Sequence, residues 1–368
     1  MSGIAVLFIY ALLAMMLLDA VIPLFRYQHS AGSTDKSSGD TKISPLKDIV
    51  SQNSTSTAKS TRIIEHLTTP SLRSNASKKL YFSLFGRFGN MLFEFTGLYA
   101  LMLETKSSQM YFQENGMSYR IIQIFPKAKQ FLITVAAIPP GLTTVNEHRG
   151  GEYDATLAQR ISAAKSDVAV GRYLSVSQYW KPKYEKEIKD VLTISKTLKE
   201  EARKFLFDIA KKKNISLANR RNSLEQWTSA KLESGQPTLV GIQVRKGDKV
   251  DKDWALPDNG YFARAMDHFR AKYKYVYFIV VSEDVNWAQQ NIVGPDVLYS
   301  TSPVDILELT LLSLCDHTIM SVGTFSWWAA YLAGGDVVYF KDHMFKHSPH
   351  RNFYNDAHYF LPNWKPML

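Results

Sequence analysis

The sequence predicts an α/β protein built on parallel sheets that are covered by helices on both faces. From about residue 238 onward, short apolar runs alternate with amphipathic segments at the spacing of strand–helix units. An earlier unit repeats this pattern, because a short apolar run at 81–85 leads through a glycine-containing turn into a segment with a helical apolar stripe. Ligands of such sheets bind at the carboxyl ends of the strands, so we look for function in the loops after strands.

The elements can be assigned in chain order. The first strand, 81–85, precedes a helix at 91–104, and the Lys-rich stretch 181–213 predicts an exposed helix within a region, 105–235, that shows no other clear pattern. Thereafter the sequence predicts strands at 239–244, 275–281, 297–299, 318–321 and 337–340, with helices at 258–273, 284–292, 304–314 and 325–333.

The N-terminus predicts a membrane anchor. Residues 4–25 are apolar except for Asp19, and about 22 residues are enough to cross a bilayer core. No basic residue precedes the run, which favours an uncleaved anchor over residues 1–27 rather than a cleaved signal peptide. Arg26 on the C-terminal flank favours a cytoplasmic location for the rest of the chain, so the charge pattern alone does not predict a lumenal enzyme.

Residues 28–77 predict a flexible stem, because they are rich in Ser, Thr and Lys and nearly free of aromatic residues. Asn53 and Asn75 begin N-glycosylation triplets in this stem, and Asn214 begins a third. Two such triplets after an anchor favour a lumenal location.

Composition narrows the classes of partner. The formal net charge of +10 suits a nucleic acid, an anionic membrane or a nucleotide-sugar diphosphate, although scattered solubilising lysines explain it equally well. Aromatic residues are not interleaved with basic ones as in single-strand binding platforms, so we expect no nucleic-acid partner. The nine His residues and the single cysteine, Cys315, show no metal-ligand spacing, and Cys315 lies in an apolar run as a small buried residue.

The first notable strand–loop junction spans 240–248. A buried strand ends in Arg245 and Lys246, followed by Gly247 and Asp248. Arginine binds phosphate oxygens bidentately, and glycine allows close approach of the backbone. The alternative is an ordinary surface turn with a local Arg–Asp pair.

The second junction spans 321–328, where Gly323 separates a strand from a helix. Thr324 or Ser326 can cap the helix and also contact a phosphate, and capping alone is the alternative. The aromatic residues of this helix are expected to pack it on the sheet; they are Trp327, Trp328 and Tyr331.

The third junction is Gly86-Arg87-Phe88-Gly89-Asn90, again between a strand and a helix. Glu94 lies one turn after Asn90, either as a general base near the same cleft or as a solvated helical carboxylate.

These motifs, in this order, resemble the α-1,2-fucosyltransferases of glycosyltransferase family 11. The resemblance rests on GRFGN (86–90), VRKGD (244–248), CDHTIM (315–320) and GTFSWWAAYLAGG (323–335). It covers about residues 80–105 and 238–340. Gln243, Lys246 and Met91 depart from it, since the family usually has His, Arg and Gln there.

The resemblance implies a GT-B-like architecture of two Rossmann-like domains, an acceptor-side domain at 78–235 and a GDP-fucose-binding domain at 236–368, and inverting chemistry without a metal. It further implies a donor site in which Arg245 binds the diphosphate. The other donor-site residues that it implies are Gln243, Lys246, Gly323, Thr324 and Ser326, with Arg87 and Asn90 across the cleft. Asp248 and Glu94 are the candidates for the general base.

The leading hypothesis is transfer of L-fucose from GDP-fucose to a terminal galactose-type residue of a glycoprotein or glycolipid glycan, in α-1,2 linkage. The enzyme would be a single-pass type II Golgi membrane protein with a lumenal catalytic domain. The alternatives are fucosyl transfer of another linkage or acceptor, and a non-catalytic glycan- or nucleotide-binding protein, which the departures at Gln243 and Lys246 suggest.

Overall fold

The computed structural model describes residues 77–215, 217, 237–246, 254–344, 348, 351 and 354–368. All of them belong to one compact unit, Ser74–Leu368. The predicted anchor, the stem with Asn53 and Asn75, and the loop residues Gly247 and Asp248 lie outside the described residues, apart from Ser77. Within the described ranges, no helix combines the length and the apolar character that crossing a membrane requires.

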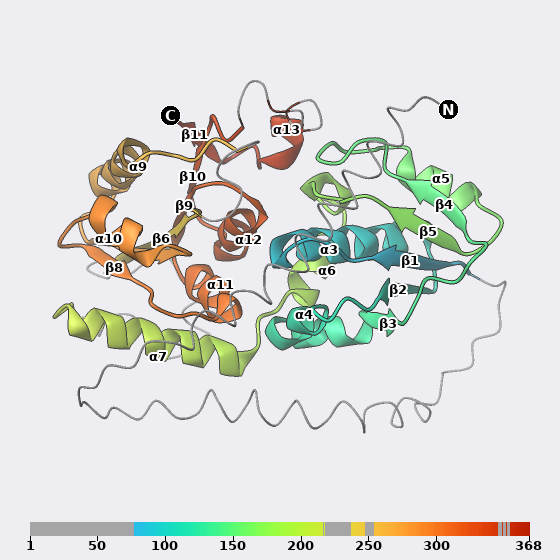
Figure 1. The fold of residues 1–368 in the computed structure, drawn as a ribbon, viewed down its shortest axis with the longest axis horizontal. Helices are drawn as coiled ribbons and strands as arrows, with labels where there is room; N and C mark the ends of the chain where they lie inside the picture. The colour runs from blue at the N-terminus through green and yellow to red at the C-terminus, as the bar shows by residue number, and fades with distance from the viewer. Residues whose placement is uncertain are drawn as a thin grey trace, which may run out of the picture. The chain divides into compact units, whose positions relative to one another are not determined.

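The first sheet has five strands, all parallel, in the order β3-β2-β1-β5-β4 (Figure 1). Its strands are β1 (Lys79–Ser83), β2 (Gln109–Gln113), β3 (Ile133–Val135), β4 (Thr143–Asn146) and β5 (Val168–Gly171). The long helix α3 (Phe88–Thr105) comes after β1, and 14 of its 18 residues are buried. The shorter helices of this part are α4 (Tyr119–Ile124), η3 (Pro126–Gln130), α5 (Leu157–Ala163), η4 (Ser177–Tyr179) and α6 (Glu185–Val191).

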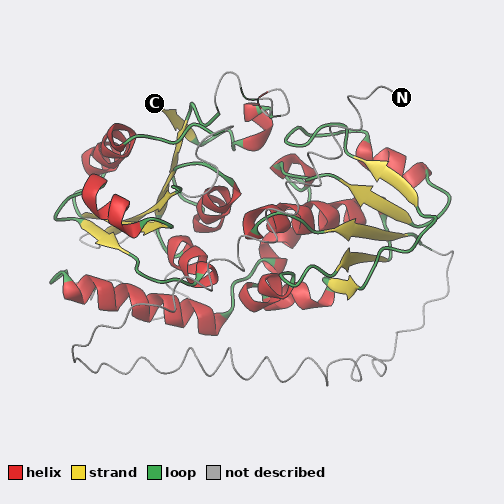
Figure 2. Ribbon diagram, in the orientation of Figure 1, coloured by secondary structure: helices red, strands yellow, loops and turns green. Residues whose placement is uncertain are grey.

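The second sheet has six parallel strands in the order β11-β10-β9-β6-β7-β8 (Figure 2). Its strands are β6 (Thr238–Val244), β7 (Val276–Ser282), β8 (Val297–Tyr299), β9 (His317–Met320), β10 (Val337–Phe340) and β11 (Lys365–Met367). Its helices are α7 (Lys196–Lys212), α9 (Asn259–Lys272), α10 (Val285–Asn291), α11 (Asp305–Ser313), α12 (Thr324–Ala333) and α13 (Asp356–Tyr359). Counted from β6, this is the strand order 3-2-1-4-5-6 of the Rossmann fold.

The two sheets confirm the predicted α/β class with parallel sheets. They also agree with the arrangement of two Rossmann-like halves that the GT-B resemblance implies. Helices α9 and α10 cover one face of the second sheet, and α11 and α12 cover the other (Figure 1). Helix α7 packs against α11 and β8, so it covers the second sheet although it precedes residue 236.

The region without a clear pattern, 105–235, contains four strands and several short helices among its described residues. The Lys-rich stretch 181–213 is helical as predicted and forms two helices, α6 and α7, each of which is exposed on one face and buries apolar residues on the other. Cys315 is buried as predicted, and Gly334, with φ of 76°, is the left-handed C-cap of α12.

One apolar core extends from the first sheet to α11 and α12 of the second. Phe93 of α3 lies at its centre, with its ring centroid 4.6 Å from that of Trp327 and 4.9 Å from that of Trp328. Trp180 stacks on Trp328 at 5.8 Å, and its Nε1 donates to the Tyr331 hydroxyl at 3.2 Å. Helix α12 packs on β9 of its own sheet as expected, and its aromatic side chains also join it to the first half, because α3 lies directly against α12.

Candidate active site

The candidate site lies where the strand order of the second sheet reverses, between β6 and β9. Strands β6 and β9 are neighbours, yet the chain leaves β6 toward β7 and leaves β9 toward β10, on opposite sides. Loops diverge at such a switch point and leave a crevice at the carboxyl ends of the strands. The loop after β6 begins with Arg245, and the loop after β9 contains Gly323.

Arg245 and Gly323 lie against each other. A Cβ atom on Gly323 would sit 3.7 Å from both Cδ and Nη1 of Arg245. Gly323 has φ of +92°, a backbone conformation that favours glycine, and it is the N-cap of α12. The backbone N–H of Arg245 donates to the Ser321 hydroxyl at 3.0 Å. The predicted proximity of Arg245 and the 323–326 turn is thus observed.

The N-terminus of α12 has no side-chain cap, so the prediction that Thr324 or Ser326 caps this helix is wrong. The Thr324 hydroxyl instead donates to Asn90 Oδ1 at 2.8 Å, and the Ser326 hydroxyl donates to Gln243 Oε1. Both hydroxyls are engaged by partners on other elements. The positive end of the helix dipole beside Arg245 favours an anionic ligand.

Gln243 supports this loop from within the sheet. Its side chain is 4% exposed, and its Oε1 also accepts from the Ser321 hydroxyl at 3.0 Å. Lys246 extends toward α10, where its Nζ lies 3.9 Å from the centroid of the Trp287 ring in a cation–π contact. These two departures from the family pattern therefore hold structural contacts.

The glycine-rich turn of the first half reaches the same place. Asn90 accepts the bond from Thr324, and Arg87 pairs with Glu283, which comes directly after β7, at 3.1 Å. The Trp328 indole donates to the Gly89 carbonyl at 2.9 Å. A Cβ atom on Gly89 would lie 2.6 Å from Thr324 Oγ1, so only glycine permits this approach. Arg87 and Asn90 thus lie across from α12, as the resemblance implies.

Glu94 is buried rather than solvated, so the solvated alternative is wrong. Its side chain is 0% exposed, and Oε2 accepts from the Phe85 N–H at 2.9 Å, while Oε1 has no hydrogen-bond partner among the described residues. Burial raises its pKa well above the ordinary value. Its role as a general base, like that of Asp248, stays a prediction.

Tyr359 belongs to this neighbourhood although no sequence pattern indicated it. Its hydroxyl is buried without a hydrogen-bond partner in the described part of the chain. Burial raises its pKa well above the usual value, Tyr354 adds to this, and nearby Arg245 opposes it. Glu283 was also missed, but the rule that sites lie at strand ends would have found it directly after β7.

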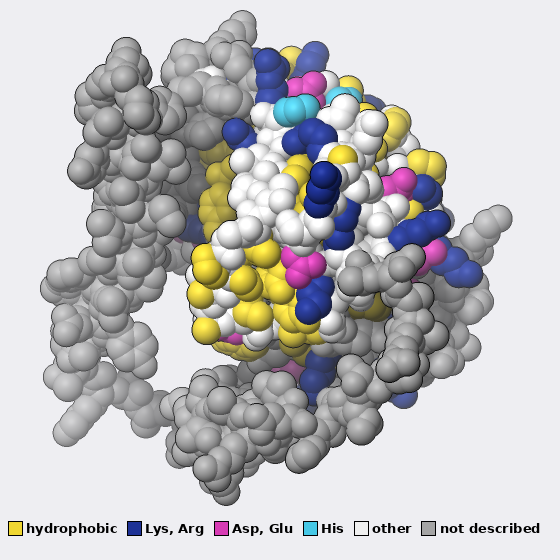
Figure 3. All heavy atoms as spheres, turned by 90° about the vertical axis from the view of Figure 1, so that its right-hand side faces the viewer, with side chains coloured by type: hydrophobic (Ala, Val, Ile, Leu, Met, Phe, Trp, Pro, Cys, Tyr) yellow, Lys and Arg dark blue, Asp and Glu magenta, His cyan; other side chains and the backbone are white. Residues whose placement is uncertain are grey.

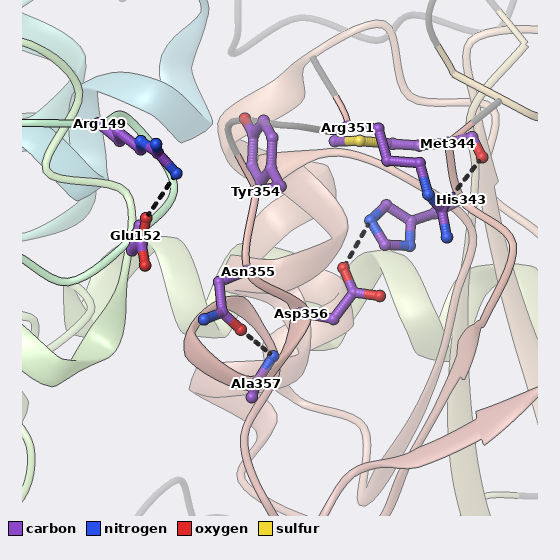
Figure 4. A pocket seen from close by; sticks show the side chains of 9 residues that line it. All are labelled: Arg149, Glu152, His343, Met344, Arg351, Tyr354, Asn355, Asp356 and Ala357. Carbon is purple, nitrogen blue, oxygen red and sulfur yellow. Dashed lines mark hydrogen bonds and ion pairs between the residues drawn. The ribbon is translucent and has the colours of Figure 1, made fainter. Parts of the chain in front are cut away.

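A pocket of about 410 Å³ opens beside these residues, between the loop after β4 and the segment after β10 (Figure 4). Arg149 and Glu152, 3.8 Å apart, line one side, and the Tyr354 ring lies between this side and the other. On the other side His343 faces Asp356 at 3.5 Å. The pocket is lined by positively charged, negatively charged and polar side chains, and Arg245 is not among them.

Basic side chains are not gathered into a single patch on the face that Figure 3 shows. On the face in Figure 3, Lys and Arg side chains are spread among acidic, polar and apolar ones. Asn214, the glycosylation candidate that the structure describes, is exposed in the turn after α7. No group of three or more His, Cys, Asp or Glu side chains that could hold a metal occurs among the described residues.

The family model for glycosyl transferase family 11 matches residues 52–367. The chain belongs to glycosyl transferase family 11. This confirms the resemblance inferred from the four motifs, and it places all three strand–loop junctions inside the matched region of this family 11 member.

Curated relatives match part of this family 11 chain. It is 39% identical over 146 residues to galactoside alpha-(1,2)-fucosyltransferase 2 of Mus musculus, covering 36% of this chain and 42% of that protein. It is 34% identical over 189 residues to the protein of the same name from Pongo pygmaeus, covering 48% of this chain and 49% of that one. The matched part thus spans less than half of these relatives.

Solved structures resemble the family 11 chain more distantly. Fucosyltransferase NodZ from Bradyrhizobium aligns with a TM-score of 0.42 at 12% identity, covering 74% of this chain and 98% of that one. POFUT1 in complex with GDP aligns with a TM-score of 0.40 at 12% identity, covering 75% and 98%.

Proposed function

We propose that this protein transfers L-fucose from GDP-fucose to a terminal galactose-type residue of a glycan, in α-1,2 linkage and with inversion. Family membership and the similarity to galactoside alpha-(1,2)-fucosyltransferases support this reaction. The observation that carries it is the meeting of Arg245 with Gly323 at the β6/β9 switch point, beside the uncapped start of α12.

The chemistry follows from this geometry. An acceptor hydroxyl oxygen attacks C1 of fucose, the bond from C1 to the diphosphate oxygen breaks, and GDP leaves with the electron pair while a base takes the hydroxyl proton. Negative charge grows on the diphosphate, where the Arg245 guanidinium and the N-terminus of α12 stabilise it. Arg87 and Asn90 hold the facing side of the cleft through Glu283 and Thr324.

The test uses the full chain in detergent with labelled GDP-fucose and a set of galactosides, and the linkage of the product is determined by NMR. We expect Arg245→Ala to lower turnover by about 100-fold or more and to weaken GDP binding. Arg245→Lys keeps the positive charge but loses the bidentate guanidinium, so its activity should lie between that of the wild type and that of Arg245→Ala. Arg203→Ala, on α7, is the matched control and should behave as wild type.

Each alternative has its own outcome in this experiment. A product with another linkage would support the second enzyme hypothesis. GDP binding that depends on Arg245 without turnover by the wild type would support the non-catalytic protein. Full activity of Arg245→Ala would exclude the proposed donor site.

The proposal includes a location: a type II Golgi membrane protein with a lumenal catalytic domain and an N-terminal anchor. The apolar run at 4–25 and the acceptor triplets at Asn53, Asn75 and Asn214 support it. If it holds, the cellular protein resists alkaline extraction from membranes, and glycosidase treatment increases its gel mobility. Replacing all three asparagines with Gln should abolish that mobility change.

A further inference from the structure

The first sheet has a switch point of its own, and aromatic side chains occupy it. The chain runs from β1 outward through β2 to β3, whereas β5 and β4 lie on the other side of β1. Phe85 comes after β1 and Tyr173 after β5, at the carboxyl ends of two adjacent parallel strands. A crevice is therefore expected between them.

Phe85 and Tyr173 form a ring pair that remains open to solvent. Their centroids are 4.6 Å apart with an interplanar angle of 44°. Phe85 is 43% exposed and Tyr173 is 40% exposed, in contrast to the buried aromatics of the core. Exposed aromatic rings at a strand-end crevice offer apolar surface to a ligand.

The backbone that carries Tyr173 is held in an unusual conformation. Arg172 and Leu174 both have positive φ, 81° and 47°, which non-glycine residues rarely adopt. The buried Glu147 fixes this loop, because its carboxylate accepts from the Leu174 N–H at 3.2 Å and from the Tyr179 hydroxyl at 2.7 Å. Strained residues persist where their surroundings over-determine them, and such positions cluster at ligand sites.

The ring pair borders the polar pocket. Tyr173 lies on Gly150, where a Cβ atom would come within 2.9 Å of the ring. The neighbouring residues Arg149 and Glu152 line the pocket together with Tyr354 (Figure 4). A pyranose has an apolar C–H face and a rim of hydroxyls, so an exposed aromatic ring beside a cationic donor and an anionic acceptor matches a sugar ring.

We propose that Phe85 and Tyr173 bind the C–H face of one pyranose ring of the glycan acceptor, and that Arg149 and Glu152 hydrogen-bond its hydroxyls. This inference rests on the proposed function. It assigns the nucleotide to the switch point of the second sheet and the acceptor to that of the first. The Arg87–Glu283 ion pair, whose arginine is two residues from Phe85, links the loop after β1 to the loop after β7, the strand next to β6.

The test measures sugar binding and transfer separately on the full chain in detergent. Saturation-transfer NMR with lactose reports the bound ring, and kinetics with labelled GDP-fucose report both KM values. We expect Tyr173→Ala to raise the KM for lactose about 10-fold and to lose the NMR signal, with the KM for GDP-fucose within about twofold. Tyr173→Phe keeps the ring and should bind as wild type does.

Tyr275→Ala is the matched control, because Tyr275 is an equally exposed aromatic, at 50%, located just before β7. It should leave both KM values unchanged. Gly150→Ala, which pushes the Tyr173 ring aside without removing it, should also raise the lactose KM and covers the case that Tyr173→Ala does not fold.

The outcomes separate the two proposals. If fucose is transferred and neither Tyr173→Ala nor Gly150→Ala changes lactose binding, the acceptor platform is wrong and the proposed function stands. If lactose binds through Tyr173 but no fucose is transferred, the platform stands and the proposed function is wrong.

Discussion

Glu308, on α11, is a carboxylate close to two other carboxylates, Asp305 and Glu283. Burial and the nearby Asp305 and Glu283 raise its pKa to about 8. Arg120 pairs with Asp305 and Arg87 with Glu283, so the two neighbours have cationic partners from the first half of the chain. Glu308 is therefore expected to be protonated in the folded protein at neutral pH.

The consequence is a pH-dependent stability. In the unfolded chain Glu308 has an ordinary pKa near 4.5, so the folded state binds more protons between that value and about 8. The stabilisation is complete below the unfolded pKa and is lost as the pH rises through about 8. We expect the Tm of the wild type to fall between pH 6 and pH 8 by about 3 °C more than that of Glu308→Gln.

Scanning calorimetry across this pH range measures the difference. Glu187→Gln, which changes an exposed carboxylate on α6, should match the wild-type profile. Parallel profiles for wild type and Glu308→Gln would mean that Glu308 is ionised in the folded protein.

Single residues also show how far sequence reasoning can reach. The proximity of Arg245 and Gly323 was predictable because both follow buried parallel strands, whose carboxyl ends meet at one edge of a sheet. Gln243 is a predicted donor-site residue, but its amide is buried under two hydroxyls, a placement that depends on the register of β6 against β9. Tyr173 was not identified, since nothing local distinguishes it from any loop tyrosine.

At the scale of elements, the helices of the second half differ in how their first turns are satisfied. Helix α9 has an ordinary cap, in which the Asp258 carboxylate accepts from the Tyr261 N–H at 2.8 Å. Helix α12 has Gly323 at the same position and no side-chain acceptor. Helices α7 and α11 also lack a side-chain cap, but the first turn of α12 begins beside Arg245, where the proposed function places an anion.

We therefore predict that Asp258→Ala lowers the free energy of unfolding by about 1 kcal/mol, the usual value of an N-cap. Chemical denaturation monitored by circular dichroism measures it. Asp258→Asn keeps an acceptor and should remain close to wild type. Asp267→Ala, on the exposed side of the same helix, should have almost no effect; an equal loss for both Ala variants would show that the cap is not the cause.

Helices and strands were predictable where one pattern of apolar residues continued over a long segment and clear start or stop residues marked its ends. Beyond residue 238 each of the five predicted strands and four predicted helices is present within one or two residues, because these strands are largely buried and form apolar runs. Strand β11 was not predicted, and two of its three residues are exposed. Between 105 and 235 the strands are short and half-exposed. In β4, three of four residues are exposed, so no alternation marks it in the sequence.

At the scale of the whole molecule, the main feature is one apolar core to which both sheets contribute. Its centre lies where Phe93 meets Trp327 and Trp328, and it was not predictable because the contacts join residues more than 200 positions apart. A second, separate core lies between the second sheet and the α9–α10 layer.

This arrangement predicts different effects from two similar substitutions. Phe93→Ala should cost about 3–5 kcal/mol and increase hydrogen exchange in both β1 and α12. Phe269→Ala, in the separate core, should cost a similar amount but increase exchange only around β6, β7 and α9. Exchange that rises in the first half alone for Phe93→Ala would contradict a shared core.

Packing of α12 against α3 has a consequence for the entry of the proposed substrates and the release of the products. Separation of the two halves by a hinge motion would expose Trp180, Trp327 and Trp328, each of them fully buried. Each Å² of apolar surface exposed in this way costs about 25 cal/mol. If the proposed function holds, we expect substrates to enter and products to leave without separation of the two halves, through smaller rearrangements such as opening of the solvent-accessible Arg87–Glu283 pair.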